Sequence, residues 1–122
     1  LKIVGLKLIR VDHELAHQHY GEHEGKPFFD GLVDFITSGP VVALVLQGKN
    51  AVTIIRETMG TTDPVKAAPG TIRGDLAADI SRNLIHGSDS PDNALKEISL
   101  FFKPAELLDW SSELDRWIIE SG

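Results

Sequence analysis

The sequence contains no cysteine among its 122 residues. A disulfide framework and a metal site built on thiolates are therefore excluded for this stretch of chain. The sequence also lacks any apolar run close to the roughly 18 residues that a membrane-spanning helix needs. Its start carries no signal-peptide pattern. We therefore expect a cytoplasmic protein that has no membrane partner.

Positive charge is also scarce, because 12 lysines and arginines face 18 aspartates and glutamates, for a formal net charge of -6. An acidic protein is a poor non-specific ligand for nucleic acid, although a local basic pocket can still hold a small phosphate compound. The hydrophobic and charged fractions are ordinary for a globular protein, and 122 residues suffice for one domain with its own core. We expect one domain and no specific nucleic-acid partner.

The segment that most suggests chemistry is 82–91, in which two aliphatic residues lead into His86 and small polar residues follow. Residues 84–85 are predicted to end a short buried strand, and the serine and proline at 90–91 are typical of a helix start. Imidazole is largely neutral and nucleophilic near pH 7, and Gly87 lets a ligand approach the backbone closely. The competing interpretation is a core histidine whose ring nitrogens are satisfied locally.

A second histidine-rich segment, residues 12–23, formally contains the zinc-protease pattern H-E-x-x-H at His13, Glu14 and His17. On a helix that spacing puts both imidazoles on one face and leaves the glutamate as a base. A glycine ends the predicted helix too early for a third ligand to return. We favour a short, solvated helix that is N-capped by Asp12, and a zinc metallohydrolase stays an alternative.

The hydrophobic pattern elsewhere predicts alternating strands and helices. The apolar run 41–46 is typical of a central strand covered on both faces, and Asn50 is placed to cap the helix that follows it. The remaining expected elements are a strand from residue 1 to 11, a buried helix over 28–38, a helix over 51–59, a loop over 61–75, a helix opening at 91 and a tail over 104–122 that docks on its own subunit or a neighbour.

Two features near these elements bear on binding. The expected loop 61–75 carries hydroxyl and guanidinium groups suited to phosphate oxygens, and long loops in small domains are often functional. The alternative is a solvated loop whose cations meet nearby aspartates. In the helix from 91, the predicted buried stripe is Ala94, Leu95, Ile98, Phe101 and Phe102. Glu97 borders that stripe, where it either faces solvent or turns to hold an imidazole.

Several stretches together resemble nucleoside diphosphate kinase. They are Tyr20, Pro-Phe-Phe at 27–29, Ser-Gly-Pro-Val-Val at 38–42, Pro-Gly-Thr-Ile-Arg-Gly-Asp at 69–75 and Asn-Leu-Ile-His-Gly-Ser-Asp-Ser at 83–90. The resemblance implies an α+β, ferredoxin-like sandwich in which helices pack on a four-stranded antiparallel sheet. It also implies a homohexamer or homotetramer. The implied reaction is ping-pong transfer of the γ-phosphoryl group between nucleotides through His86, with broad base specificity.

The same resemblance assigns roles to residues that the pattern had already indicated. Ser88 and Glu97 would position His86, and Mg²⁺ would bridge the nucleotide phosphates without a metal site of the protein's own. The nucleotide would be held by Phe28 against the base, by Arg56, Thr62 and Arg73 at the phosphates, by Asn83 at the sugar, and by Tyr20, Leu32 and Ile80 around the pocket.

One departure from the family pattern stands out. The family's first strand and its Lys-Pro-Asp-Gly motif would precede Leu1, so residues 1–122 would be a single kinase domain that is incomplete at its N-terminus. We expect about 30 further residues upstream, on the family's length and the strand-like opening. A non-catalytic nucleotide-binding module with the same fold remains a further alternative.

Overall fold

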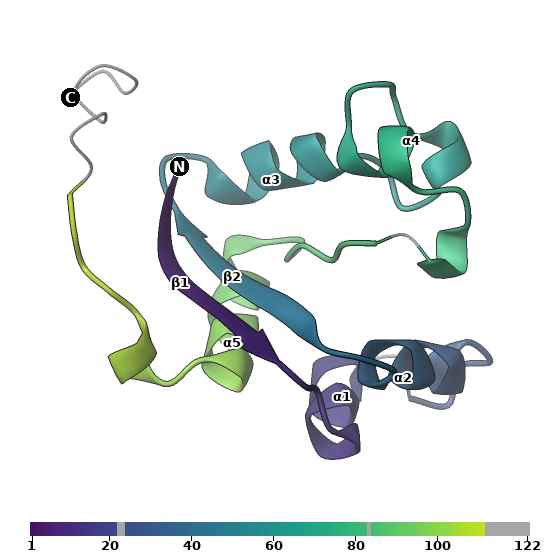
Figure 1. Ribbon diagram of the computed structural model, residues 1–122, viewed down its shortest axis with the longest axis horizontal. Helices are drawn as coiled ribbons and strands as arrows, with labels where there is room; N and C mark the ends of the chain where they lie inside the picture. Colours follow the sequence, from purple (N-terminus) through teal and green to yellow (C-terminus); the bar gives the residue numbers. More distant parts are fainter. Residues whose placement is uncertain (22–23, 83, 112–122) are drawn as a thin grey trace.

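The computed structural model describes residues 1–21, 24–82 and 84–111. The chain is of α+β class, with a small antiparallel sheet and helices arranged around it (Figure 1). The elements in chain order are β1 Lys2–Ile9, α1 His13–His19, α2 Phe29–Thr37, β2 Val41–Gln47, α3 Ala51–Met59, a 3-10 turn Pro64–Lys66, α4 Ile72–Leu76, a 3-10 turn Ile80–Arg82, α5 Pro91–Phe101 and a 3-10 turn Pro104–Glu106.

Strands β1 and β2 form the sheet, and they run antiparallel with Lys2 opposite Gln47 and Ile9 opposite Val41. Among the described residues the sheet has these two strands, where the resemblance implied four. The strand predicted at residues 84–85 is wrong for this part of the chain, because no described strand pairs with it. Leu84 instead has a φ of 74° and a side chain that is 55% exposed.

The prediction that β2 is covered on both faces is also wrong within the described residues. Val42 and Leu44 are exposed, and so are Leu8 and Leu6, which lie opposite them on β1. Helix α5 lies against the other face of the sheet, where Val45 is buried (Figure 1). The continuous apolar run therefore has one packed face and one open face here.

The main core lies between the end of β1 and the helices α1 and α2. Its buried members are Val11, Ala16, Phe29 and Val33, and the last two share one face of α2 because they are four residues apart. The side chain of Asp12 accepts a hydrogen bond from the backbone N–H of Leu15 at 2.8 Å, so the predicted cap of α1 is confirmed. This core fixes α1 beside α5, which positions the site described below.

Helix α5 begins as predicted, with the hydroxyl of Ser90 accepting from the backbone N–H of Asn93 at 3.1 Å and a proline at the first helical position. The predicted buried stripe holds for Phe102 but not for Leu95, which is 70% exposed. The tail docks on β1, because the backbone N–H of Leu108 donates to the carbonyl of Val4 at 2.8 Å. Residues 112–122 lie outside the described part of the chain.

The predicted helix over 51–59 is confirmed as α3, but its start differs from the expected cap. Asn50 occupies the N-cap position with a φ of 58° and its side chain makes no capping hydrogen bond. Asparagine tolerates this left-handed conformation better than most residues, which accounts for its presence there. The stretch 61–75, predicted as a loop, instead contains the turn at 64–66 and helix α4.

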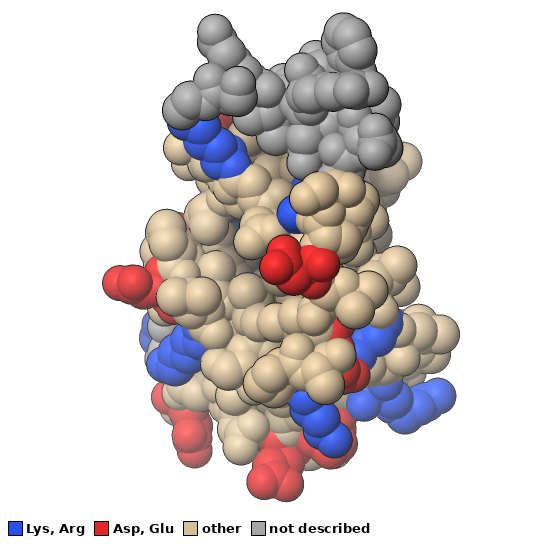
Figure 2. Space-filling model, turned by 90° about the vertical axis from the view of Figure 1, so that its left-hand side faces the viewer, with Lys and Arg blue, Asp and Glu red and all other residues tan. Residues whose placement is uncertain are grey.

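No helix among the described residues is both long and apolar enough to cross a bilayer. On the face that Figure 2 shows, acidic and basic side chains are interspersed and do not gather into a basic patch.

Candidate active site around His86

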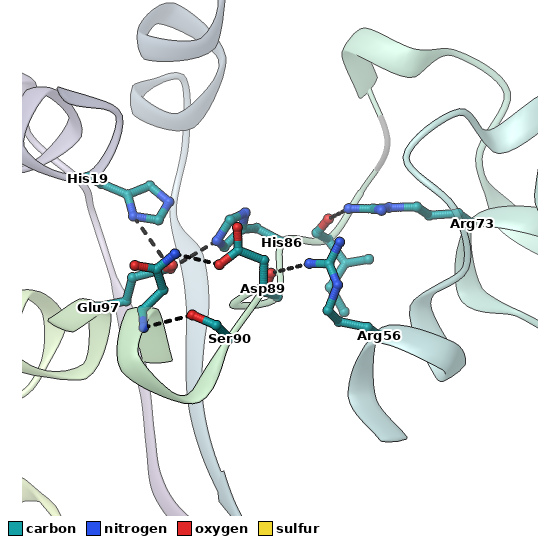
Figure 3. A network of polar contacts seen from close by, with 10 residues as sticks. His19, Arg56, Arg73, His86, Asp89, Ser90 and Glu97 are labelled. Carbon is teal, nitrogen blue, oxygen red and sulfur yellow. Dashed lines mark hydrogen bonds and ion pairs between the residues drawn. The ribbon is translucent and has the colours of Figure 1, made fainter. Parts of the chain in front are cut away.

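The loop that carries His86 is held by two arginines that reach it from α3 and α4. A guanidinium nitrogen of Arg56 donates to the carbonyl of Gly87 at 2.9 Å, and one of Arg73 donates to the carbonyl of Ile85 at 2.5 Å. The backbone is thus fixed on both sides of His86. Figure 3 shows the arginines approaching from one side of the loop and His19 and Glu97 approaching from the other.

Arg73 is buried, with 5% of its surface exposed, and it also donates to the carbonyl of Gly60 at 3.2 Å. Burial lowers the pKa of Arg73, and the positive charge of Arg56 lowers it further. A shift caused by a like charge means that the two guanidinium groups lie close to each other. An anion bound between them would relieve that repulsion, as a phosphate group does.

Gly87 has a steric role that the sequence did not predict. A Cβ atom at this position would lie 2.4 Å from Sδ of Met59 and 3.4 Å from Cγ2 of Ile55, both on α3. Glycine therefore lets the loop approach α3 closely, whereas we expected it to admit a ligand to the backbone.

On the other side of the loop, His86 faces a carboxylate. Its Nε2 lies 2.9 Å from Oε2 of Glu97, a residue near the middle of α5. A carboxylate oxygen accepts hydrogen bonds, so this contact favours the tautomer that has the proton on Nε2 and the lone pair on Nδ1. The His86 side chain is 51% exposed, whereas that of Glu97 is 23% exposed. The contact with Glu97 orients the ring of His86 through Nε2, while half of the side chain remains exposed.

His19 joins this pair from α1, and the sequence reasoning did not find it. We expected the histidines of this helix to be solvated, which holds for His13 and His17 but is wrong for His19, whose side chain is 4% exposed. Its Nδ1 lies 3.7 Å from the same Glu97 oxygen that His86 contacts. Helical spacing gave the signal, because His19 follows the buried Ala16 by three residues and so shares its face.

The residues expected to hold a base lie near the start of α2. Phe28 is 51% exposed, with the ammonium of Lys26 5.8 Å from its ring centroid, and Leu32 lies half-buried one turn further along. Tyr20 is half-buried, and burial raises the pKa of its hydroxyl, with a further contribution from Glu97. Ile80 is 56% exposed.

Of the three phosphate-binding candidates, Arg56 borders a groove of about 550 Å³ beside the loop, whereas Thr62 and Arg73 are not among the residues that line it. Thr61 lines the groove together with Arg56. The predicted ligand Thr62, the next residue in the chain, is exposed. Ser88 is half-buried. Asn83 lies outside the described residues, so its expected sugar contact stays a prediction.

The zinc interpretation of α1 finds no support. In the described part of the chain, the one group of three potential ligand atoms is formed by His19, His86 and Glu97, and it does not include His13 or His17. Those two histidines and Glu14 are exposed, and the ring of His17 lies edge-on to Phe29 with centroids 5.0 Å apart.

Comparison with known proteins gives a consistent result. The family described as nucleoside diphosphate kinase matches residues 1–107. A nucleoside diphosphate kinase from Pelotomaculum thermopropionicum is 65% identical over 119 residues, which cover 98% of this chain and 80% of that protein. One from Carboxydothermus hydrogenoformans is 60% identical, with 98% of this chain and 80% of that protein covered.

Solved structures agree with this match. A halophilic nucleoside diphosphate kinase from Halobacterium salinarum in complex with CDP superposes with a TM-score of 0.94 at 56% identity, over 98% of this chain and 80% of that one. A nucleoside diphosphate kinase family protein from Babesia bovis gives a TM-score of 0.93 at 40% identity, over 97% of this chain and 80% of that one.

Fold and site together define a phosphotransferase that acts on nucleotides. The chain belongs to the nucleoside diphosphate kinase family, and it transfers the terminal phosphoryl group of a nucleoside triphosphate to a nucleoside diphosphate. The zinc hydrolase and the non-catalytic module are thereby set aside.

Proposed function

We propose that His86 carries the phosphoryl group between the two nucleotides as a phosphohistidine, in a ping-pong reaction. The observation that carries this proposal is the 2.9 Å contact between Nε2 of His86 and Glu97, which leaves Nδ1 as the free nucleophile on the exposed side of the loop. The guanidinium groups of Arg56 and Arg73 lie on the side of the same loop that is opposite to Glu97. In the proposed complex, these groups attract the negatively charged phosphate chain toward the ring.

In the first half-reaction Nδ1 gives its lone pair to the γ-phosphorus. The bond from that phosphorus to the bridging oxygen breaks, and its electron pair leaves with the nucleoside diphosphate. In the second half-reaction a terminal oxygen of the acceptor diphosphate attacks the same phosphorus, and the N–P electron pair returns to His86. Arg56 and Arg73 stabilise the charge on the transferred oxygens, because phosphoryl transfer depends chiefly on positioning and charge neutralisation.

We assign the base to Phe28, with Tyr20, Leu32 and Ile80 around it, the phosphates to Arg56, Thr62 and Arg73, and the sugar to Asn83. Support for the base position comes from the exposed ring of Phe28 at the start of α2. Stacking tolerates every base, so purine and pyrimidine nucleotides are both substrates. Ser88 is assigned to the support of His86.

The groove also fits a nucleotide that brings Mg²⁺ with it. Its lining includes the carboxylates of Glu57 and Asp89, and oxygen is the ligand type that Mg²⁺ prefers. A hydrogen bond from Asn93 lowers the pKa of Asp89, so this carboxylate stays ionised. Bound Mg²⁺ would neutralise phosphate charge, held mainly by the phosphates themselves.

We further propose the ferredoxin-like sandwich with a four-stranded sheet for the enzyme's fold, a homohexamer or homotetramer as its assembly, and the cytoplasm as its location. The open face of β1 and β2 is compatible with further packing partners, because exposed aliphatic residues in register favour burial.

Incubation of the full-length enzyme with ATP and Mg²⁺ in the absence of an acceptor tests the mechanism. We expect one phosphoryl group per subunit, labile in acid and stable in base. His86→Ala should abolish both the label and turnover, whereas Ser88→Ala should only weaken them. An acid-stable label, or turnover by His86→Ala, would favour direct transfer between two bound nucleotides.

A further inference from the structure

His19 has a buried ring in this site, and the mechanism proposed above assigns it no role. It ends α1 and packs edge-on against Phe101 of α5, with ring centroids 5.2 Å apart. Tyr20 lies on another side at 4.5 Å. With its side chain 4% exposed, the ring is nearly excluded from solvent, although an imidazole is costly to bury without a polar neighbour.

The pair formed by His86 and Glu97 lies beside this ring. Nδ1 of His19 lies 3.7 Å from Oε2 of Glu97, and that same oxygen lies 2.9 Å from Nε2 of His86. The two imidazole rings stand at 86° with centroids 4.8 Å apart. One carboxylate oxygen therefore faces two imidazoles that come from different elements, α1 and the loop before α5 (Figure 3).

The two contacts differ in length. A separation of 2.9 Å is a hydrogen bond, whereas 3.7 Å is too long for one. Hydrogen bonds in an active site can tighten when the substrate complex forms. The ring of His86 gains positive charge when its Nδ1 bonds to phosphorus, and Glu97 must then hold the Nε2 proton firmly.

We propose that His19 is a positioning residue for phosphoryl transfer, which anchors the Glu97 carboxylate so that Glu97 holds His86 in the tautomer with Nδ1 free. This inference rests on the phosphohistidine mechanism proposed above. His19 forms no bond to phosphorus and gains or loses no proton in the step. It restricts the rotation of a flexible glutamate whose orientation decides which ring nitrogen is nucleophilic.

A role in packing alone is the competing explanation, and a pair of substitutions separates the two. His19→Phe keeps a ring in the aromatic cluster and removes both nitrogens. His19→Asn loses the ring and puts an amide N–H close to the position of Nδ1. If packing alone matters, phenylalanine is the better replacement. If the polar contact matters, asparagine is the better one.

The readout is the single-turnover rate of phosphoenzyme formation from ATP and Mg²⁺ in the full-length enzyme, measured beside nucleotide affinity and thermal stability. We expect His19→Phe to slow this rate by roughly 10- to 100-fold, the usual effect of removing a group that orients a reactive one. Nucleotide affinity should stay at the wild-type value, and His19→Asn should recover part of the rate. His17→Phe, at an exposed position of the same helix, is the matched control and should keep the wild-type rate.

The ¹⁵N resonances of His86, assigned with His86→Gln, give a second readout that packing does not change. The wild type should show the proton on Nε2, and His19→Phe should show a mixture of tautomers. A wild-type rate with an unchanged tautomer in His19→Phe overturns the role of His19, and so does a slower rate in His19→Asn than in His19→Phe. A label that persists in His86→Ala would instead overturn the proposed mechanism, so the two failures are distinguishable.

Discussion

Nε2 of His86 and Oε2 of Glu97 lie 2.9 Å apart, and their contact joins the loop before α5 to the middle of that helix. The capped start of α5 at Ser90 sets the direction of the glutamate, while Arg56 holds the loop through the carbonyl of Gly87. The orientation of the imidazole is therefore fixed by two elements that are themselves anchored by local hydrogen bonds.

Replacement of Glu97 by glutamine should slow phosphoenzyme formation about 10- to 100-fold. The amide can present either its oxygen or its N–H to Nε2, so it selects no single tautomer, and being neutral it does not stabilise the positive charge that develops on the ring. Nucleotide affinity should change little, since the carboxylate is assigned no nucleotide contact. Rapid-quench measurement of the phosphoenzyme together with nucleotide titration checks both statements. Glu14→Gln, at an exposed glutamate of α1, is the control and should behave as wild type.

Local signals in the sequence predicted much of the fold. Asp12 and Ser90 were expected to cap helices and both do so, because a cap depends on residues within one helical turn. The predicted end of the helix over 51–59 is also observed, and the φ of 90° at Gly60 explains why glycine follows it. The arrangement of the β1 and β2 segments as strands followed from their aliphatic content.

The failures concern contacts between residues far apart in the sequence. Burial of His19 depends on the packing of α1 against α5, and the need for glycine at 87 depends on Met59 from α3. Exposure of Leu44 likewise depends on which elements cover the sheet, and not on the apolar run itself. Spacing from Ala16 indicated the face of α1 that carries His19, but residue type and spacing do not identify the partners of His19, Gly87 or Leu44. The sequence therefore supplied the candidate His86 but not the network around it.

Phe28→Ala should weaken the binding of all nucleoside diphosphates by about 1–3 kcal/mol, the usual contribution of one stacked base. The exposed ring offers a π-face but no pattern of donors and acceptors that distinguishes bases. The loss should therefore be similar for purine and pyrimidine substrates. Steady-state kinetics with several diphosphate acceptors tests this, and a loss confined to one base would contradict the assignment. Phe35→Ala, an exposed aromatic on the same helix, is the matched control.

Gly87→Ala should destabilise the protein by about 1–3 kcal/mol, because a methyl group at this position collides with the buried side chain of Met59. Turnover should fall as well, since His86 is the preceding residue. Gly31→Ala on α2 meets no atom within 4 Å and should stabilise the helix by roughly 0.5–1 kcal/mol. Urea unfolding of the two variants should therefore give changes of opposite sign.

A second substitution tests the cause of that loss. Met59→Val shortens the side chain that the new methyl group meets. Met59→Val should therefore lower the free energy of unfolding less in the Gly87→Ala variant than in the wild type. Additive effects in this double-mutant cycle would mean that Met59 is not the obstacle.

Tyr20 should titrate above its ordinary value of 10.0, because burial raises the pKa of its hydroxyl and the negative charge of Glu97 raises it further. It is the single tyrosine of this sequence, and Tyr20→Phe supplies the blank for an ultraviolet titration of tyrosinate. Glu97→Gln should move the pKa only part of the way back, since burial is the larger cause. Titration at the ordinary value in the wild type would contradict the buried placement of the ring.

The same shift predicts how stability depends on alkaline pH. The folded state holds the phenolic proton more tightly than the unfolded state, so the stabilisation is fully present below the unfolded pKa and is lost as pH rises through the folded pKa. The free energy of unfolding should therefore decline more steeply above pH 10.0 in the wild type than in Tyr20→Phe, which has no proton to lose. Urea unfolding across this pH range measures the difference. Parallel declines in the two proteins would show that other groups, and not Tyr20, govern alkaline unfolding.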